Sequence, residues 1–287
     1  MTSPSDGVER LVLDVNGFRF DALAGGPVSG PLVILLHGFP EFADSWLPIL
    51  GRLAEAGFRA VAVDQRGYSP GARPGRVADY AVDLLVSDVL GFADTFGQAR
   101  FHLVGHDWGG IVAWTLAARH PGRLASLCVL SVPHVDALLD AIANDPDQQR
   151  RSWYVKLFRA PFHIAEFLLK AWNFRGLKKA YDGKLSAPQV EANVRRLREP
   201  GALTAALNWY RALDVSARIG LVEVPTLYVW GDRDQALGPV AAHATAAHVS
   251  GPYRFEILDG ASHWLLEEEA AAVGRLILEN LGAKPSN

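Results

Sequence analysis

The residue with the clearest chemical potential is Asp107, in the run Gly105-His106-Asp107-Trp108-Gly109-Gly110. The run joins a strand-like apolar segment (101–104) to a helical one (111–114). A turn of this kind, with glycine on each side of X, is typical of the nucleophile elbow, which lifts the side chain of X above a sheet. Serine is the usual X. A carboxylate there is ionised at neutral pH, attacks without a base and leaves an ester on the enzyme. The alternative is that Asp107 only caps the following helix.

An ester on Asp107 must be hydrolysed, and that step needs a general base acting on water. Chains with this elbow carry the nucleophile, the acid and the histidine in that order. Among nine histidines the order favours His263, in Gly260-Ala261-Ser262-His263-Trp264 after the last strand-like run. The acid should follow the preceding strand, where Gly231-Asp232-Arg233-Asp234 offers two carboxylates. We favour Asp234 because it lies further out, whereas Asp232 follows glycine as a turn-forming aspartate does.

Two backbone N–H groups complete the predicted site. The apolar run 32–36 ends in His37-Gly38-Phe39-Pro40-Glu41. The loop after that strand supplies one donor of the oxyanion hole, and the residue after the nucleophile supplies the other. These donors are Phe39 and Trp108. A tight turn without a catalytic role fits the loop equally well, and we interpret His37 as a buried, hydrogen-bonded loop histidine.

Bringing these groups together requires a sheet whose strands end at one edge. Two alternating segments, 11–13 and 18–20, flank Asn16-Gly17, which is a strong hairpin signal. Short apolar runs follow at 32–36, 60–63, 101–104, 126–130, 226–230 and 254–258. Most of them are unbroken, as expected of strands covered on both faces. Helical segments such as 80–96 lie between several of them. The pattern predicts an α/β fold with a mostly parallel, doubly wound sheet.

The alternation of strands and helices stops between Ser131 and Val224. The intervening stretch has a helical pattern with breaks at prolines, and a structureless loop of that length is implausible. We therefore predict a helical cap at residues 134–217. It is inserted between an N-terminal part of the core (1–133) and a C-terminal part (218–287).

The composition narrows the classes of function. Charged residues make up 21% of the chain and the net charge is −3, which gives no electrostatic reason to expect a nucleic-acid partner. No apolar run approaches the ~20 residues that span a bilayer, and residues 1–10 lack a signal-peptide pattern. The single cysteine, Cys128, excludes an intrachain disulfide. We predict a cytoplasmic protein that needs no metal or organic cofactor, since no glycine-rich phosphate loop and no zinc-ligand spacing occurs.

Four motifs together resemble those of the epoxide hydrolases of the α/β-hydrolase fold superfamily. They are His37-Gly38-Phe39-Pro40-Glu41, Asp64-Gln65-Arg66-Gly67-Tyr68, Gly105-His106-Asp107-Trp108-Gly109-Gly110 and Ser262-His263-Trp264. The resemblance covers essentially the whole chain and is strongest outside the cap. It implies the α/β-hydrolase fold and an apolar epoxide as substrate. Asp107 would be the nucleophile, and His263, oriented by Asp234, would activate the water.

The resemblance also implies two cap tyrosines that hold and protonate the epoxide oxygen. Asn208-Trp209-Tyr210-Arg211 is similar to the motif of the second tyrosine. Tyr154 lies where the family places the first, ahead of a phenylalanine and a proline, although Phe162 replaces the usual glycine after that proline. Tyr181 is the alternative for this first position.

Two other functions stay open from the sequence. A haloalkane or haloacid dehalogenase has the same aspartate nucleophile but stabilises a departing halide with N–H donors, for which Trp108, Trp153 and Trp172 are candidates. A non-catalytic receptor or scaffold on the same fold is the second, and an intact nucleophile, acid and histidine argue against it.

Overall fold

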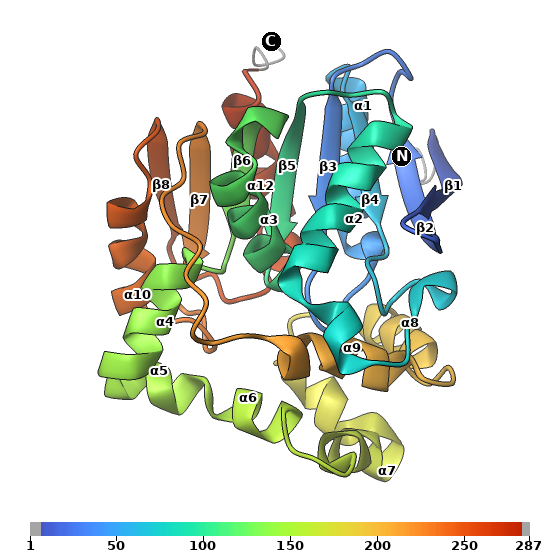
Figure 1. The fold of residues 1–287 in the computed structure, drawn as a ribbon, viewed down its shortest axis with the longest axis vertical. Helices are drawn as coiled ribbons and strands as arrows, with labels where there is room; N and C mark the ends of the chain where they lie inside the picture. Colours follow the sequence, from blue (N-terminus) through green and yellow to red (C-terminus); the bar gives the residue numbers. More distant parts are fainter. Residues whose placement is uncertain (1–6, 283–287) are drawn as a thin grey trace.

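The computed structural model describes residues 7–282. At its centre lies an eight-stranded sheet in the order β1-β2-β4-β3-β5-β6-β7-β8 (Figure 1). Strand β2 is antiparallel to β1 and β4, and all neighbours from β4 to β8 are parallel. The predicted α/β class and mostly parallel sheet are confirmed. The strands are β1 (Val8–Val15), β2 (Phe18–Gly25), β3 (Leu32–Leu36), β4 (Arg59–Val63), β5 (Phe101–His106), β6 (Leu124–Leu130), β7 (Thr226–Gly231) and β8 (Tyr253–Leu258).

The predicted hairpin is present, and its turn explains why Asn-Gly occurs there. Val15 pairs with Phe18, which leaves Asn16 and Gly17 as a two-residue loop. Their φ angles are 51° and 79°. Two consecutive positive φ angles match the right-handed twist of the strands, and asparagine and glycine adopt them at least cost.

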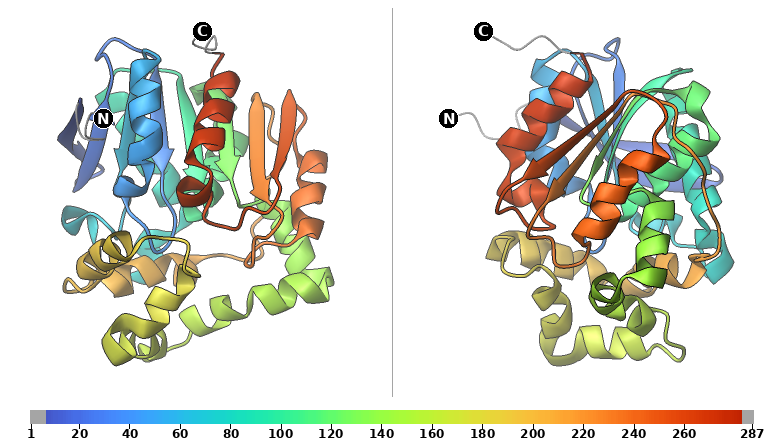
Figure 2. Two further views of the ribbon diagram at one scale, coloured as in Figure 1. Left: turned by 180° about the vertical axis from the view of Figure 1, so that it is seen from behind. Right: turned by 90° about the vertical axis from the view of Figure 1, so that its left-hand side faces the viewer.

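Helices cover both faces of the sheet, so the central strands are apolar without a break. Every residue of β3 and β4 is buried. Along β3, Ile34 belongs to the core under α2 (Val82–Thr95) and α3 (Trp108–Arg119), whereas Val33 and Leu35 belong to the core under α1 (Leu47–Glu55) and α12 (Ala270–Asn280). Figure 1 shows α2 and α3 in front of the sheet, and the reverse view in Figure 2 shows the opposite pair.

Six helices lie between β6 and β7, beyond the carboxyl ends of the parallel strands (Figure 1). They are α4 (Val135–Asn144), α5 (Pro146–Arg151), α6 (Trp153–Phe158), α7 (Ile164–Ala180), α8 (Ala187–Leu197) and α9 (Ala202–Ala212). We call them the cap helices, and all of them fall inside the predicted range 134–217. The two boundaries that separate the three predicted segments stay a prediction. Residues 1–6 and 283–287 of the predicted core parts lie outside the described residues. Two short helices, α10 (Pro239–Ala244) and α11 (Leu265–Glu268), complete the fold.

Hydrogen bonds fix the cap helices to the core close to the elbow. The indole Nε1 of Trp209 in α9 donates to the carbonyl of Arg66 at 2.7 Å. The hydroxyl of Tyr181 donates to the carbonyl of Pro40 at 2.8 Å. Both acceptors belong to motifs noted in the sequence, so these motif loops position the cap as well as the core. Within residues 7–282 no helix combines the length and apolarity needed to cross a membrane.

Candidate active site

Asp107 lies between the end of β5 and the start of α3, with φ 50° and ψ −121°. A positive φ is rare for a residue with a side chain and marks a strained turn. The flanking glycines are required by close approach of the backbone. A Cβ on Gly105 would lie 2.3 Å from the carbonyl oxygen of Gly109, and one on Gly109 would lie 2.2 Å from that of Leu36. The sequence therefore forms the predicted elbow, and the side chain of Asp107 projects from it.

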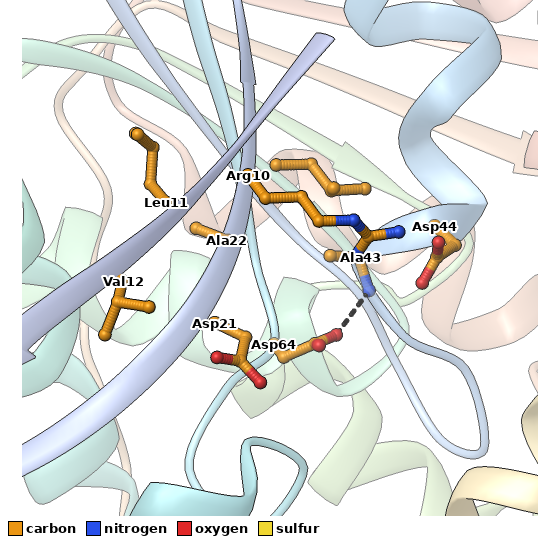
Figure 3. Close-up of a pocket in the computed structure, with 9 residues that line it drawn as sticks. Arg10, Leu11, Val12, Asp21, Ala22, Ala43, Asp44 and Asp64 are labelled. Carbon is orange, nitrogen blue, oxygen red and sulfur yellow. Dashed lines mark hydrogen bonds between the residues drawn. The ribbon is translucent and has the colours of Figure 1, made fainter. Parts of the chain in front are cut away.

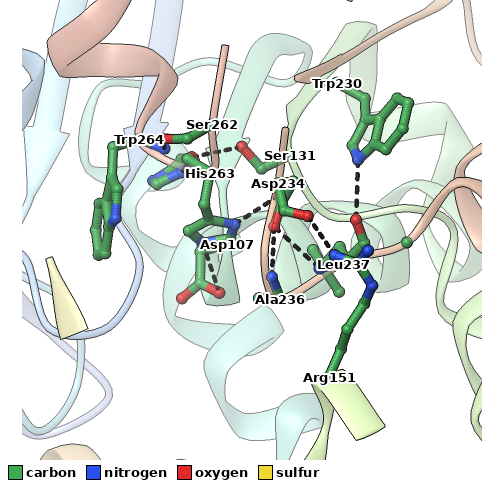
Figure 4. Close-up of polar contacts among 12 residues, drawn as sticks. Asp107, Ser131, Arg151, Trp230, Asp234, Ala236, Leu237, Ser262, His263 and Trp264 are labelled. Carbon is green, nitrogen blue, oxygen red and sulfur yellow. Dashed lines mark hydrogen bonds and ion pairs between the residues drawn. The ribbon is translucent and has the colours of Figure 1, made fainter. Parts of the chain in front are cut away.

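The imidazole of His263 lies between two carboxylates (Figure 4). Its Nε2 is 3.5 Å from Oδ2 of Asp107, and its Nδ1 is 2.8 Å from Oδ2 of Asp234. Asp234 follows β7 and His263 follows β8, so the carboxyl ends of three strands contribute one residue each. The structure thus brings together the three side chains that the sequence singled out.

Asp234 is held so that one carboxylate oxygen remains for the histidine. Its Oδ1 accepts hydrogen bonds from the backbone N–H of Ala236 at 2.8 Å and of Leu237 at 2.9 Å. The guanidinium of Arg151, from the cap helix α5, donates to the Asp234 carbonyl at 2.5 Å. Asp232 has a different environment: its Oδ1 accepts from Gly260 N–H at 2.7 Å and links the segments that follow β7 and β8.

Of the two predicted oxyanion donors, Phe39 contacts the carboxylate of Asp107 directly. The N–H of Phe39 donates to Oδ1 of Asp107 at 2.8 Å. Trp108 is the first residue of α3, and the N–H groups of a first helical turn have no partner within the helix. One oxygen of Asp107 therefore already occupies the position where an oxyanion would form, and Oδ2 remains as the attacking oxygen.

In this buried site the positive charge of His263 and the negative charges of Asp107 and Asp234 stabilise one another. Burial by itself would raise the pKa of Asp107, but the hydrogen bond and positive charge of His263 outweigh it and hold that pKa below its usual value. Burial would lower the pKa of His263, yet the charge of Asp234 and the bonds to both carboxylates raise it well above the usual value. The resting pair is consequently a carboxylate next to an imidazolium.

Tyr210 and Tyr154 lie above this pair in a cluster of aromatic rings. The Tyr210 ring is 5.0 Å from that of Trp108 and 5.5 Å from that of Phe39, in both cases edge to face. The ring of Tyr154 is 6.3 Å from that of Tyr210, and Phe158 contacts both. Burial, followed by the negative charge of Asp107, raises the pKa of each phenol. Both hydroxyls therefore stay protonated and are able to donate.

The alternative first tyrosine, Tyr181, is used elsewhere. Its hydroxyl is bonded to the Pro40 carbonyl, and its ring lies 5.4 Å from that of Trp264. Two of the three tryptophans considered as halide donors point to solvent, since Trp153 is 63% exposed and Trp172 is 85% exposed.

Comparison with known proteins agrees with this geometry. A family model described as the alpha/beta hydrolase fold matches residues 31–270. The chain is 38% identical to "Epoxide hydrolase 3" of Xenopus tropicalis, over 98% of this chain and 80% of that protein. It is 33% identical to "Epoxide hydrolase A" of Mycobacterium tuberculosis, over 95% of this chain and 97% of that protein. This chain belongs to the epoxide hydrolases of the α/β-hydrolase fold. The crystal structure of Epoxide Hydrolase A from Mycobacterium thermoresistibile superposes on it with a TM-score of 0.85 at 26% identity, covering 98% of this chain and all of that one.

Behind His263, this epoxide hydrolase has buried polar residues to which the sequence analysis assigned no role. The His263 carbonyl accepts hydrogen bonds from Nε2 of His106 at 2.9 Å and from Oγ of Ser131 at 2.8 Å. The Nδ1 of His106 lies 3.3 Å from Oε2 of Glu41. Burial raises the pKa of Glu41 to about 7, and burial together with Glu41 raises that of Glu267 to about 10. His106 and Glu41 stand in the quoted motifs, but a motif does not reveal which of its residues meet in space.

His37 has the structural role that we predicted for it. It is fully buried, its Nδ1 is bonded to the Gly38 carbonyl at 2.9 Å, and its Nε2 accepts from Gln65 N–H at 3.2 Å. Burial lowers the pKa of His37 to about 3, so the ring is neutral and tautomerically fixed.

One group of side chains has the composition of a metal site. His134, Asp136 and His248 offer ligand atoms within 4.8 Å of one another. Both Asp136 oxygens accept backbone N–H groups, from Ile219 at 2.9 Å and Gly220 at 3.1 Å. The two imidazole rings are stacked, 4.7 Å apart and 6° from parallel. Because a metal lies in the plane of each imidazole that binds it, stacked rings do not converge on one ion, and the group instead fixes the start of α4.

A pocket of about 300 Å³ lies beside the hairpin β1–β2 (Figure 3). Its lining includes Arg10, Asp21, Asp44 and Asp64, and Asp64 accepts the N–H of Ala43 at 2.8 Å. None of the predicted site residues lines it. The charged side chains that line this pocket are paired or exposed to solvent. The pocket does not include the nucleophile Asp107.

Proposed function

We propose that this protein converts an apolar epoxide to a vicinal diol through a covalent ester on Asp107. The observation that carries the proposal is a carboxylate at the elbow with one oxygen bound by Phe39 N–H and the other beside His263. Tyr210, which is buried, and Tyr154, which is partly buried, supply the acid that an epoxide needs. The apolar nature of the substrate is supported by the rings of Phe39, Trp108 and Phe158 around those tyrosines.

In the first step Oδ2 of Asp107 attacks one epoxide carbon and the carbon–oxygen bond of the ring breaks. The electron pair of that bond moves to the epoxide oxygen, which takes a proton from Tyr154 or Tyr210. An alkoxide is a poor leaving group unless it is protonated or hydrogen-bonded, and general acids contribute typically 10²–10⁴-fold to such steps. The second tyrosine holds the same oxygen by a hydrogen bond.

Ester formation changes the charge beside His263. In the resting enzyme Asp107 and Asp234 both stabilise the imidazolium. Esterification removes the charge of Asp107, so the pKa of His263 falls and its proton can return to the tyrosine through solvent. The neutral imidazole is then a base, and it forms only after the substrate is bound covalently.

In the second step water attacks Cγ of the Asp107 ester and gives its proton to Nε2 of His263. The tetrahedral oxyanion forms on Oδ1, where the N–H groups of Phe39 and Trp108 stabilise it. Collapse breaks the bond between Cγ and Oδ2, and Oδ2 leaves on the diol with the proton returned from His263. The new carboxyl group, which now holds the oxygen of the water, gives its remaining proton to His263 and restores the resting pair. The carboxylate of Asp107, the imidazole of His263 and the phenols of Tyr154 and Tyr210 account for every proton transfer. We therefore propose a reaction without a metal or cofactor. Treatment with EDTA should leave the activity unchanged.

The route is tested with the variant His263→Gln and styrene oxide. Alkylation should proceed without turnover, and the peptide containing Asp107 should gain the mass of one substrate. His243→Gln, which changes an exposed histidine, is the matched control and should turn over normally. Full activity of His263→Gln would refute the assignment of the base.

A single turnover of the unaltered enzyme in oxygen-18 water tests the nucleophile. Label should appear in the Asp107 carboxylate, and the first diol released should carry none. Label in the diol alone would show direct attack of water on the epoxide and would overturn the covalent route.

A further inference from the structure

The cap helices α6 and α7 expose aromatic side chains that the fold does not use. Among residues 7–282, every large aromatic side chain that is exposed lies in the segment 153–172. Phe162 is 90% exposed, and Trp172, Phe167 and Trp153 are 85%, 75% and 63% exposed. Ile164 and Leu168 in the same segment are also exposed. We call these six residues the cap patch; large exposed apolar surface usually marks an interaction site.

The elements that carry the cap patch lie on the side of the cap turned away from the sheet. Figure 1 shows α6 and α7 as the elements furthest from both termini, and the views in Figure 2 agree. Helix α6 divides its residues between two faces. Tyr154 and Phe158 pack inward on Tyr210, while Trp153 and Lys156 point to solvent. Helix α6 therefore links the patch, through Trp153, to the tyrosines of the site.

Positive charge accompanies the exposed rings, both between them and in the helical turns that follow Trp172. Residues 152–181 contain six lysine and arginine residues and a single acid, Glu166. Glu166 is buried and bonded to Arg211 at 2.7 Å, so it does not neutralise the surface. Four exposed bases form no ion pair with a carboxylate anywhere in residues 7–282, namely Lys156, Lys170, Arg175 and Lys179. The face as a whole is apolar and cationic.

Phe162 shows that the exposed rings are not a by-product of folding. Its φ is 59°, in the left-handed region that favours glycine over a bulky aromatic residue. Its side chain makes no use of the core, being almost entirely exposed. A phenylalanine at this position is costly to the backbone and to solubility, and no contact of its ring with the core offsets that cost.

We propose that the cap patch docks on the surface of an anionic phospholipid bilayer. Phenylalanine and tryptophan rings insert into the interfacial region of a membrane, and lysine and arginine between them bind anionic headgroups. A second copy of this chain is a poor occupant, because two such faces would bring like charges together. Docking places the cap next to the lipid phase, where apolar molecules concentrate.

Vesicle flotation measures the binding directly. The full-length protein is mixed with vesicles of phosphatidylglycerol and phosphatidylcholine at 1:1, and separately with pure phosphatidylcholine vesicles. We expect binding to the anionic vesicles at least tenfold tighter than to the neutral ones, weakening as salt rises. Vesicle-bound protein should also show quenching of tryptophan fluorescence by brominated lipid, because Trp153 and Trp172 enter the interface.

Two double variants separate the apolar and charged contributions. Phe162→Ser with Phe167→Ser should weaken binding to anionic vesicles at least tenfold, while the matched pair Val28→Ser with Val240→Ser, exposed apolar residues elsewhere, should not. Lys170→Glu with Arg175→Glu should weaken it by tenfold or more, since each base near an anionic surface contributes roughly a fivefold factor. Arg10→Glu with Arg52→Glu, on exposed residues of the core, is the charge control.

Three results would overturn the proposal. They are equal binding of the protein to neutral and anionic vesicles, loss of binding in the control pairs as large as in the patch pairs, and no binding to anionic vesicles at low salt. A dimer in solution that dissociates in the Phe162→Ser/Phe167→Ser variant would assign the patch to self-association instead. These measurements use no epoxide, so they stand or fall independently of the proposed reaction.

Discussion

The core half and the cap half of the site are held by different kinds of contact. In the core, directional bonds to the backbone fix each group: Asp234 accepts two N–H groups, and Asp107 accepts that of Phe39. In the cap, Tyr154 and Tyr210 are held mainly by ring-to-ring packing. Hydrogen bonds set positions to within tenths of an ångström, whereas packing of rings tolerates small shifts. The bond-making geometry is thus rigid, and the part that meets the substrate is adaptable.

Phe39 and Trp108 belong to both the core half and the cap half of the site. Their backbones belong to the core half, and their rings pack against the cap half. The backbone N–H of Phe39 donates to the carboxylate of Asp107, and that of Trp108 lies at the start of α3 next to it in the chain. The rings of both residues form the packing surface for Tyr210. A movement of the Tyr210 ring therefore reaches the oxyanion hole through the rings of Phe39 and Trp108. Substitutions in the core should abolish single chemical steps, and those in the cap should cause graded losses.

The largest effect should follow from Asp107→Asn. Loss of the nucleophile should reduce diol formation by about 10⁴-fold or more. The same change removes one of the two carboxylates beside His263, so the pKa of His263 should fall. Steady-state assays measure the first effect, and nitrogen-15 NMR of the imidazole the second. Slow deamidation would restore activity with time, and mass spectrometry of the Asp107 peptide detects it.

Asp234→Asn should be nearly as severe, because the amide no longer fixes the tautomer or the charge of His263. A loss of roughly 10²–10⁴-fold is expected, mainly in hydrolysis of the ester. Rapid-quench mass spectrometry should find the ester accumulating. Asp232→Asn is the matched control and should change turnover less than about threefold. If Asp232→Asn were the more damaging of the two, the orienting acid would be misassigned.

The core half of the site was predictable because short-range rules determine it. Asn16-Gly17 requires a tight hairpin, and Gly105 and Gly109 are demanded by backbone contacts that any chain with this elbow makes. The order of Asp107, Asp234 and His263 follows from strands that end at one edge of the sheet. The roles of these residues stay predictions, although the structure brings them into contact.

The cap half was less predictable because its helices are placed by packing across proline breaks. Periodicity alone does not decide whether Tyr154 or Tyr181 faces the nucleophile; the hydrogen bond from Tyr181 to Pro40 and the rings around Tyr154 do. The cluster of His106, Glu41 and Glu267 also escaped notice. Its members come from the loop after β3, the end of β5 and helix α11, far apart in the chain, and no spacing rule relates them.

Tyr210→Phe and Tyr154→Phe should each slow alkylation by about 10- to 100-fold, since one phenol remains to protonate the oxygen. Hydrolysis of an ester already formed should change little. The double variant should lose far more than either single variant. Stopped-flow tryptophan fluorescence on single turnovers separates the two steps. Tyr181→Phe is the control, because its hydroxyl serves the backbone, and an equal loss of alkylation in that variant would contradict the assignment of Tyr154.

The smallest effect on chemistry should come from Glu166→Gln, which tests what stabilises the cap rather than the reaction. Burial would raise the pKa of Glu166, but hydrogen bonds from Arg211 and His163 outweigh it and lower the pKa to about 2. Because the folded pKa lies below the unfolded one, this stabilisation is complete above about pH 4.5 and is lost as pH falls toward 2. Urea unfolding at pH 7 should show a loss of about 1–3 kcal/mol in the free energy of unfolding, with turnover changed less than threefold.

The difference in unfolding free energy between Glu166→Gln and the unaltered protein should shrink between pH 4.5 and 3. An equal difference at pH 3 and pH 7 would mean that the glutamate acts through packing and that its charge contributes nothing. Arg211 adjoins Tyr210 on α9, so a charge-dependent effect would also show that an ion pair supports the position of the second tyrosine. The cap would then depend on one directional contact in addition to its aromatic packing, and the contrast with the core would be one of degree.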